Sequence, residues 1–575
     1  MTDARGQFTL TYNGEIYNYL EIRAELVRTG SIFRSHSDTE VIIEAYKRWG
    51  TDCLSRFNGM FAFALYDSVR GVLFCARDRY GEKPFLFGFG KEFFAFASEY
   101  KGLLQHPGLS LDIDEWRLLC AANNASTGLD ADRQTVFNDV QQLLPGEAME
   151  VDVHTLERRI WAYWCISPGE LRENVDEQDV FSEFRELLTD SVRLRLRSDV
   201  PVGSCLSGGL DSSAIVCIVR KLLGQDAPYN TFTGRFPGTS ADEWHYAEQV
   251  IDATGVISHT VEPTVDRFLD DLPRFMWMNE LPVGSSSQFA QWCVFDLARQ
   301  RGVTVLLDGQ GADEVLGGYE QYFAPYVRSL RERGEVDRLA SELPLIRERY
   351  PLALAPPARA LRDRLPFRLR HSISKHFGFG TNMLYGVKPE LAMRLMRETA
   401  PTRREGFHPL GSTLLQETFG RFLTTLLRYG DRNSMAHSRE VRLPFCDHRI
   451  AEFVFQLPPH LLMGEIQTKR LLRESMRGIL PEPIRTRWNK QGFRPPQDRW
   501  FTSPAFLRTV EDSLAAANLR SDSPWEAGWW ASALARVRAG ESSLGWTLWQ
   551  PFIIERWRES FLRPLAELRA SRTQS

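Results

Sequence analysis

A short loop rich in glycine, serine and aspartate, set between an apolar run and a helical pattern, constrains the fold of this chain most. The apolar run at 200–206 stops at Ser207-Gly208-Gly209, and a helical pattern extends from 214 to 223. This order predicts a strand, a tight turn and a helix. Two glycines let the backbone approach a ligand closely, and the turn amides together with the helix N-terminus attract an anion.

Three hydroxyls and one carboxylate in this loop suit a phosphate ligand with a bound cation. Ser207, Ser212 and Ser213 supply donors for phosphate oxygens, and Asp211 is a hard oxygen ligand for Mg²⁺. The alternative interpretation is an ordinary polar turn between a strand and a helix.

A second loop of similar composition follows a second apolar run. The β-branched run at 303–307 predicts a buried strand, and Asp308-Gly309-Gln310-Gly311-Ala312-Asp313 comes directly after it. Ligands of doubly wound sheets bind at the carboxyl ends of the parallel strands, so we expect the two loops to face one cleft. Asp211 and Asp313 would then hold pyrophosphate through Mg²⁺. Taken alone, Asp313 also fits a helix start, where acidic residues are favoured.

Several blocks of the chain resemble those of the asparagine synthetase family. SGGLDSS at 207–213 looks like the pyrophosphate-binding loop of ATP pyrophosphatases, and DGQGADEVLGGY at 308–319 is similar to the family's SGEGADELFGGY. The blocks EVRLPFCDHR at 440–449, TKRLLR at 468–473 and WNKQGF at 488–493, with Pro495 and Trp500, resemble its EVRVPFLDHR, TKYLLR and KKGFxxPxxxW. The blocks follow one another in the family's order.

The resemblance implies roles for individual residues of the nucleotide site. Lys469, expected early in an amphipathic helix, would contact phosphate and stabilise charge in the transition state. The backbone near Leu206 and Gly234 would hydrogen-bond adenine, while Asp308 and Gly309 would approach the adenosine and the α-phosphate. The ATP and pyrophosphate ligands are thus expected to be Leu206, Ser207, Gly208, Gly209, Asp211, Ser212, Ser213, Gly234, Asp308 and Gly309.

Position 310 departs from the family pattern. The family has a glutamate there that assists proton removal from the attacking ammonia, whereas this chain has Gln310, and a neutral amide cannot act as a base. Either Gln310 orients ammonia or a different acid takes over the proton.

The first part of the chain looks like the glutaminase domain of the same synthetases. The matching segments are 11–18, 37–40, 57–63 and 76–84. By resemblance, Asn13 and Gly14 would form an oxyanion hole, and Glu15 and Asp38 would hold the amino-acid end of glutamine. The fold implied is the αββα sandwich of N-terminal-nucleophile hydrolases.

The beginning of the sequence differs from that of family members with glutaminase activity, which start Met-Cys-Gly. This chain starts Met1-Thr2-Asp3 and goes straight into the strand that carries residues 12–15. The terminal cysteine is the nucleophile, and no internal cysteine has the free amine that it needs. Cys53 and Cys75 are expected to be core residues. We favour a true start that lies upstream; the alternative is that the chain lacks glutaminase chemistry.

The expected architecture has two domains. Residues 1–165 form a glutaminase-type αββα sandwich truncated at its start, 166–180 a linker, and 181–575 a doubly wound parallel α/β domain of the ATP-pyrophosphatase type with many helices. Strands are predicted at 200–206, 229–236 and 303–307. The segment 325–415 matches the family poorly, and is either an insertion that shapes the acceptor site or a variable helical surface.

Composition restricts the partners. A net charge of −4 provides no basic field for nucleic acid. Eight cysteines without Cys-x-x-Cys spacing argue against zinc and against a disulfide framework. No apolar run reaches the roughly 18 residues of a membrane span, and no signal pattern precedes the first strand, so we expect a cytoplasmic protein. A homodimer is an open alternative to a monomer.

The predicted function is ATP-dependent amidation of a carboxylate, with glutamine or free ammonia as nitrogen source. ATP and Mg²⁺ would convert the carboxylate, aspartate in the first instance, to an acyl-adenylate, and ammonia would displace AMP. Alternatives within the resemblance are amidation of sugar uronic acids and closure of β-lactam or lasso-peptide rings. A non-catalytic nucleotide-binding protein is the alternative from another class, against which Asp211, Asp313 and Lys469 all count.

The chain that begins at Met1 is expected to use free ammonia and to hydrolyse no glutamine. The reason is the lack of a terminal cysteine beside complete ATP-binding motifs. Glutamate released from glutamine by this polypeptide, above a control without enzyme, would refute the expectation. Met-Cys-Gly upstream in the reading frame would show that the start is misplaced.

Overall fold

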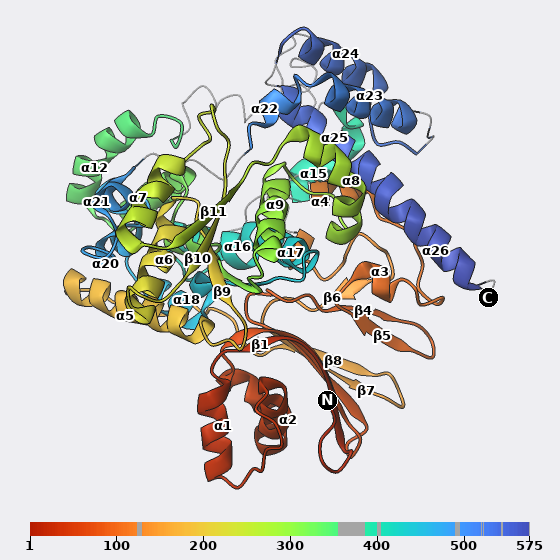
Figure 1. The fold of residues 1–575 in the computed structure, drawn as a ribbon, viewed down its shortest axis with the longest axis vertical. Helices are drawn as coiled ribbons and strands as arrows, with labels where there is room; N and C mark the ends of the chain where they lie inside the picture. The colour runs from red at the N-terminus through yellow and green to blue at the C-terminus, as the bar shows by residue number, and fades with distance from the viewer. Residues whose placement is uncertain are drawn as a thin grey trace.

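The computed structural model describes residues 1–122, 129–354, 386–398, 404–488, 495–518, 520, 522–541 and 544–573. Residues 489–493 of the WNKQGF block, and 355–385 and 399–403 of the segment 325–415, lie outside the described residues. Figure 1 shows a small N-terminal domain, in red and orange, beneath a larger α/β body.

In its described residues, the N-terminal domain contains two antiparallel sheets and four α-helices. The five-stranded sheet has the order β1-β2-β3-β7-β8 and the three-stranded sheet the order β5-β4-β6. The strands are β1 (Phe8–Ile16), β2 (Gly59–Asp67), β3 (Val72–Arg77), β4 (Leu86–Phe89), β5 (Phe94–Ala97), β6 (Gln141–Gln142), β7 (Glu147–Asp152) and β8 (Arg158–Ala162). The helices are α1 (Tyr19–Arg28), α2 (Asp38–Trp49), α3 (Tyr100–Leu103) and α4 (Glu115–Ala122).

Strand β2 shows why this domain is layered. Its side chains alternate between the two faces of the sheet. Phe61, Phe63 and Leu65 pack into the core beneath α1 and α2. Ala62 and Ala64 face the other way, into the core between the two sheets, where the small side chains let the sheets approach. The far face of the small sheet is covered by α3, α4 and C-terminal helices, so the αββα sandwich is confirmed.

Residues 1–3 pair along the outer edge of β1. The Met1 amino group donates to the Leu10 carbonyl over 2.7 Å, and Asp3 N–H donates to the Phe8 carbonyl over 2.9 Å. Cys53 and Cys75 are both fully buried, as expected of core residues.

The larger domain is built on a five-stranded parallel sheet of order β11-β10-β9-β12-β13. Its strands are β9 (Val202–Cys205), β10 (Asn230–Gly234), β11 (Ile257–Val261), β12 (Val305–Leu307) and β13 (Glu440–Arg442). The three predicted strands are present, and sequence reasoning missed β11 and β13. Helices α5 (Glu177–Arg195), α6 (Leu210–Leu223) and α7 (Trp244–Thr254) pack on one side of the sheet, and α9 (Ser287–Gln300) and α17 (Phe422–Met435) on the other. The doubly wound arrangement is therefore confirmed.

Many further helices surround this sheet. They are α8 (Val265–Asn279), α10 (Ala312–Leu316), α11 (Phe323–Glu332), α12 (Val336–Arg349), α15 (Pro389–Glu398), α16 (Pro409–Phe419), α18 (His448–Val454), α19 (Pro459–Met463), α20 (Arg470–Ser475), α21 (Glu482–Thr486), α22 (Gln497–Trp500), α23 (Pro504–Asn518), α24 (Ala527–Arg538), α25 (Gly545–Trp557) and α26 (Arg563–Thr573). Helix α5 begins at Glu177, inside the predicted linker 166–180, and the domain bounds remain a prediction.

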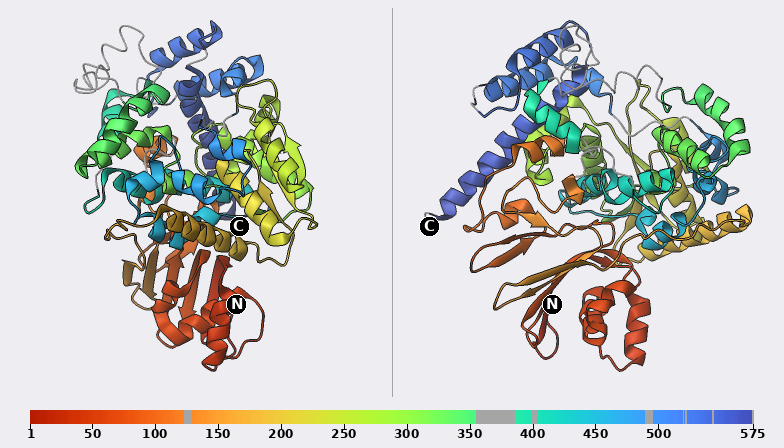
Figure 2. Two further views of the ribbon diagram at one scale, coloured as in Figure 1. Left: turned by 90° about the vertical axis from the view of Figure 1, so that its left-hand side faces the viewer. Right: turned by 180° about the vertical axis from the view of Figure 1, so that it is seen from behind.

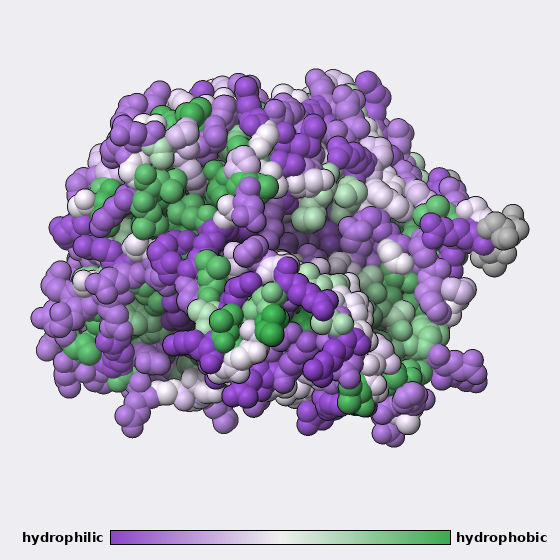
Figure 3. Space-filling view, turned by 60° about the horizontal axis from the view of Figure 1, so that its bottom comes forward, coloured by the Kyte–Doolittle hydropathy of each residue, from purple (hydrophilic) through white to green (hydrophobic). Residues whose placement is uncertain are grey.

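Hydrophobic side chains are scattered among hydrophilic ones on the face drawn in Figure 3. Within the described part of the chain, no helix combines the length and apolar character that crossing a membrane requires.

A buried carboxylate joins the two domains. Asp447, which is 0% exposed, accepts a hydrogen bond from Asn58 Nδ2 of the N-terminal domain over 2.9 Å. It also pairs with Arg195 at 3.3 Å and with Arg449 at 2.8 Å. Burial alone would raise the pKa of Asp447, but the hydrogen bond from Arg449 and the charge of Arg195 hold it well below its usual range.

We predict that Asp447→Asn lowers the free energy of unfolding by about 3–5 kcal/mol, because Arg195 would keep its charge without a partner. Chemical denaturation at pH 7 measures this. Asp190→Asn is the matched control, since Asp190 pairs with the same Arg449 at 2.8 Å but is about one-third exposed, and it should cost less than about 1 kcal/mol. Because the pKa of Asp447 is depressed in the folded protein, its contribution to the free energy of unfolding is present above about pH 4 and is lost as the pH falls below that value. Equal losses in the two variants would contradict the assignment.

Candidate active site

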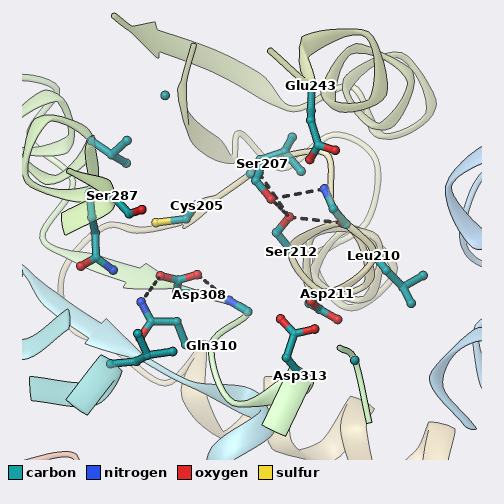
Figure 4. A pocket seen from close by; sticks show the side chains of 18 of the residues that line it. Cys205, Ser207, Leu210, Asp211, Ser212, Glu243, Ser287, Asp308, Gln310 and Asp313 are labelled. Atoms are coloured by element: carbon teal, nitrogen blue, oxygen red, sulfur yellow. Dashed lines mark hydrogen bonds between the residues drawn. The ribbon is translucent and has the colours of Figure 1, made fainter. Parts of the chain in front are cut away.

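The two predicted loops line a single cavity of about 360 Å³ at the carboxyl ends of β9 and β12. Figure 4 shows Ser207, Asp211 and Ser212 of the first loop across from Asp308, Gln310 and Asp313 of the second. The other predicted nucleotide ligands in its wall are Leu206, Gly209, Gly234, Gly309 and Lys469. None of the described residues of 325–415 lines this cavity.

Lys469 joins the two loops electrostatically. Its Nζ lies 2.6 Å from both carboxylate oxygens of Asp211 and 2.6 Å from Asp313 Oδ1. The lysine is only 3% exposed. Burial alone would lower its pKa, but the two carboxylates outweigh that effect and raise it, so the ammonium stays charged.

Lys469 adopts an unusual backbone conformation. It is the residue before α20, with φ of 53° in the left-handed region, and not the early helical position that the sequence pattern predicted. Such a conformation costs a non-glycine residue roughly 1–3 kcal/mol and persists where surrounding contacts impose it. Here the buried ion pairs with Asp211 and Asp313 impose it.

Gly318 makes room for this arrangement. A Cβ atom there would lie 1.9 Å from Asp313 Oδ1 and 2.2 Å from Lys469 Cε, so only glycine fits while the ion pair is kept. The sequence block containing Gly317-Gly318 was noted only as part of the family resemblance, and its packing role was missed.

The first loop has the geometry of an anion-binding turn, with two qualifications. Gly208 has φ of 78°, which favours glycine, and Ser207 and Ser212 hydroxyls lie 3.1 Å apart at the start of α6. Gly208 and Ser213, however, do not contribute to the cavity wall, and the Ser213 side chain is fully buried. Ser213 therefore supports the loop from behind.

The backbone of Leu206 is already engaged within the protein. Its N–H donates to the Phe232 carbonyl over 3.0 Å, and its carbonyl accepts from the Thr233 hydroxyl over 2.6 Å. Only the second lone pair of that carbonyl is left for adenine. The structure thus narrows the predicted backbone recognition at Leu206 to a single acceptor.

Asp308 and Gln310 form a hydrogen-bonded pair directly after β12. Asp308 accepts from Gly309 N–H over 2.6 Å and from Gln310 Nε2 over 3.4 Å. Burial raises the pKa of Asp308 to about 6; the Gly309 hydrogen bond opposes this rise and the charge of Asp211 adds to it. Gln310 also lines a second, narrow cavity of about 20 Å³, shared with Met60, Glu82 and Lys83 of the N-terminal domain.

Comparison with known proteins identifies the family. The model of the asparagine synthase family matches residues 183–559, and the model of a glutamine amidotransferase domain matches residues 1–164. The chain belongs to the asparagine synthase family.

Its relatives are similar over most of the chain. Asparagine synthetase [glutamine-hydrolyzing] 3 of Bacillus subtilis is 30% identical over 83% of this chain and 74% of that protein. A putative asparagine synthetase [glutamine-hydrolyzing] of Mycobacterium bovis is 30% identical over 97% of this chain and 85% of that protein. Amidase chry2 of Gibberella zeae is 27% identical over 90% of this chain and 81% of that protein.

The amidotransferase domain of this family member holds the four predicted glutamine ligands on β1 and α2. Asp38 accepts from the Tyr12 hydroxyl over 2.8 Å and from Ile16 N–H over 3.0 Å. Asn13 Nδ2 donates to Ser98 Oγ over 3.2 Å, and Gly14 lets β1 approach β2, since a Cβ atom would lie 2.0 Å from the Met60 carbonyl oxygen.

Glu15 faces the synthetase domain. Its carboxylate lies 3.9 Å from Arg442 Nη2. Burial raises the pKa of Glu15 to about 7, the nearby charges of Glu440 and Asp38 add to the rise, and Arg442 opposes it.

Sequence reasoning missed three charged residues of the cavity wall: Glu243, Arg473 and Arg487. Arg487 forms an ion pair with Glu243 and donates to the Gly208 carbonyl over 3.3 Å. Arg473 is the last residue of the TKRLLR block, and burial lowers its pKa to about 10. Its place in that block was a usable signal, whereas Arg487 lies in no noted motif.

The Asp211 and Asp313 carboxylates fit a magnesium ion that shares the oxygens of a bound phosphate. Both already converge on one cationic atom, Lys469 Nζ, and carboxylate oxygens are the donors that Mg²⁺ prefers. In the described chain no group of three or more histidine, cysteine, aspartate or glutamate side chains is placed to hold a metal, so the remaining ligands would come from substrate and water.

We predict that Asp211→Asn and Asp313→Asn each lower pyrophosphate release by ~10² or more, the scale for removing one charge-stabilising group from an enclosed site. A coupled pyrophosphate assay measures it. Glu320→Gln, which removes an exposed carboxylate just past the second loop, should leave the rate unchanged. Near-normal pyrophosphate release by either aspartate variant would reject the assignment.

Proposed function

We propose that this protein is an ATP-dependent ligase that converts a carboxylate, aspartate in the first instance, to an amide through an acyl-adenylate. Pyrophosphate leaves when the carboxylate attacks the α-phosphate, and ammonia then displaces AMP. Adenylation is needed because a carboxylate oxygen is a poor leaving group, whereas AMP is a good one. Membership of the asparagine synthase family supports this reaction class.

One observation carries the proposal: a charged lysine held between two carboxylates at the carboxyl ends of two parallel strands. The Lys469 ammonium lies 2.6 Å from a carboxylate oxygen of Asp211 and 2.6 Å from one of Asp313, in the wall of a cavity large enough for a nucleotide. A scaffold protein has no need of this arrangement, since an isolated buried ion pair is a poor source of stability. This argues against the non-catalytic alternative.

Different residues of the cavity have different roles in adenylation, the first step of the proposed reaction. Asp211 and Asp313 would hold Mg²⁺, which supplies charge neutralisation on the phosphates when bound. Lys469 stabilises the negative charge that develops on the leaving pyrophosphate. The Ser207 and Ser212 hydroxyls and the N-terminal amides of α6 hydrogen-bond its oxygens.

Ammonia is proposed to reach the adenylate through the interface between the domains. The narrow cavity lined by Met60, Glu82, Lys83 and Gln310 lies on that route. Burial raises the pKa of Glu82 well above its usual range, and the charge of Asp431 raises the pKa of Lys83 against the effect of burial. Both shifts favour the protonated form, and a protonated carboxyl beside a lysine cation would admit neutral ammonia more readily than ammonium. Where the nucleophilic terminal cysteine is present, glutamine bound near Asn13, Gly14, Glu15 and Asp38 would be the source of this ammonia; otherwise free ammonia takes its place.

The wall opposite the charged groups favours a second class of acceptor. It consists of neutral side chains from α9, α17 and the residues just before α9, namely Ser285, Ser287, Gln288, Gln291, Val294, Phe422, Leu426 and Tyr429. Aspartate would bring an additional carboxylate and an ammonium group, which gain little from neutral partners. A sugar uronic acid presents hydroxyls and a single carboxylate, and is the second candidate on this observation.

The cysteines bear on the compartment. Seven of them form no disulfide with any described residue, and six of these seven are buried or partly buried: Cys53, Cys75, Cys205, Cys217, Cys293 and Cys446, with Cys165 the exposed one. We place the protein in the reducing cytoplasm on this basis.

Pyrophosphate release with free ammonia across a panel of carboxylates is expected to identify the acceptor. The panel contains aspartate, glutamate, glucuronic acid and galacturonic acid, with ATP and Mg²⁺ throughout. An acceptor-dependent rate of pyrophosphate release that disappears in Lys469→Met supports the proposal, because Lys469 is the described residue that bridges the carboxylates of Asp211 and Asp313. Acceptor-independent ATP hydrolysis, or no turnover with any member, would count against amidation of these acceptors.

A further inference from the structure

Four carboxylates line the large cavity, and three of them are bound to cations. Asp211 and Asp313 share the Lys469 ammonium, and Glu243 pairs with Arg487. These three carboxylates are therefore already engaged by a cation of the protein, and a base needs an oxygen that can receive the proton.

Asp308 is the exception among the four. Its hydrogen-bond donors are neutral, namely Gly309 N–H at 2.6 Å and Gln310 Nε2 at 3.4 Å, and it makes no ion pair with any described residue. Burial raises the pKa of Asp308 to about 6. At neutral pH the carboxylate is therefore mostly ionised, yet it binds a proton more readily than an ordinary aspartate, which is what a general base near pH 7 requires.

Asp308 also lies where a nucleophile from the interdomain cavity would enter the large cavity. Figure 4 shows it between Gln310 on one side and the facing Asp211 and Asp313 on the other. Gln310 contributes to both the large cavity and the narrow interdomain cavity. A nucleophile that enters from the interdomain side therefore passes Gln310 and meets Asp308 before it reaches the phosphate-binding residues.

The Gln310 amide has a free acceptor at this position. Its Oε1 is buried and has no hydrogen-bond partner among the described residues, whereas its Nε2 donates to Asp308. The bond to Asp308 fixes which end of the amide faces the carboxylate, since the carboxylate only accepts. A buried carbonyl oxygen without a partner is costly, and an N–H of ammonia would satisfy it.

We propose that Asp308 is the general base of amide formation and that Gln310 positions the attacking ammonia through Oε1. This inference rests on the proposed ligase function. The ammonia nitrogen forms a bond to the acyl carbon, and one N–H proton passes to the Asp308 carboxylate. The bond from that carbon to the adenylate oxygen then breaks, and its electron pair leaves with AMP. Asp308 returns the proton to AMP or to water when the products leave.

The first experiment separates amide formation from adenylation in Asp308→Asn. Both steps are measured with the carboxylate that wild type uses. Adenylation is measured as the acceptor-dependent exchange of labelled pyrophosphate into ATP. Amide formation is measured as the AMP released when free ammonia is supplied. We expect the rate of amide formation to fall by ~10², the loss typical of removing a general base. The rate of pyrophosphate exchange should change less than about threefold. Asp211→Asn is the matched control within the same cavity and should lose both activities.

The outcomes distinguish this inference from the function on which it rests. If wild type shows no exchange with any carboxylate, the proposed ligase function fails. If wild type exchanges but Asp308→Asn forms amide at the wild-type rate, the base is another group. If Asp308→Asn loses both activities equally, Asp308 serves ATP binding and the inference is wrong.

A pH profile and a rescue variant test the inference even if Asp308→Asn does not fold. At a constant concentration of un-ionised ammonia, wild-type amide formation should rise with pH through about 6 as Asp308 loses its proton, and exchange should not show this rise. The double variant Asp308→Ser with Gln310→Glu places a carboxylate at position 310 in place of the one lost at 308. Its rate of amide formation should be at least tenfold higher than that of Asp308→Ser alone. A flat profile, or no recovery in the folded double variant, would overturn the proposal.

Discussion

The ammonium of Lys469 between two carboxylates is the interaction on which the rest of the site depends. It ties together three segments that are far apart in the sequence, namely the turns after β9 and β12 and the turn before α20. Buried charges are tolerated only when they are paired, so the three turns have little freedom to move independently. The left-handed backbone of Lys469 and the glycine at 318 are both consequences of this contact. Binding of ATP with Mg²⁺ would exchange partners within the group: the carboxylates pass to the metal and the lysine passes to phosphate.

Local patterns in the sequence predicted that two loops meet at one cavity: apolar runs placed three strands of the parallel sheet, and glycines beside aspartates marked the ends of two of them. The αββα sandwich of the N-terminal domain was implied by the family resemblance. Strands β11 and β13 were missed for a physical reason. Ile257–Val261 lies at a sheet edge and has three consecutive polar residues between its two apolar ends, and Glu440–Arg442 is too short to show any period. Their positions are set by pairing with neighbours distant in sequence.

Other features of the site depend on tertiary contacts that no local pattern reveals. Lys469 was placed within a helix because the pattern around it is helical, yet its ion pairs hold it just before the first turn. The engagement of Leu206 by Thr233 and Phe232 was equally hidden, because it arises from the register of β9 against β10. That Asp308 forms no ion pair with a described residue follows only from the positions of the described lysines and arginines around the cavity.

The interface between the domains joins the two halves by charge as well as by apolar packing. Asp447 binds Asn58 across it, and Lys83 pairs with Asp431 at 3.0 Å, with both side chains almost completely buried. Separating the domains would break the Lys83–Asp431 pair and the hydrogen bond from Asn58 to Asp447, although Asp447 would keep Arg195 and Arg449. Breaking a buried ion pair costs several kcal/mol, which favours a closed interface. In the proposed reaction, a closed interface would keep ammonia from being protonated in bulk water. Ammonia would then arrive from one direction, past Gln310, and a base would be needed at only one side of the proposed adenylate.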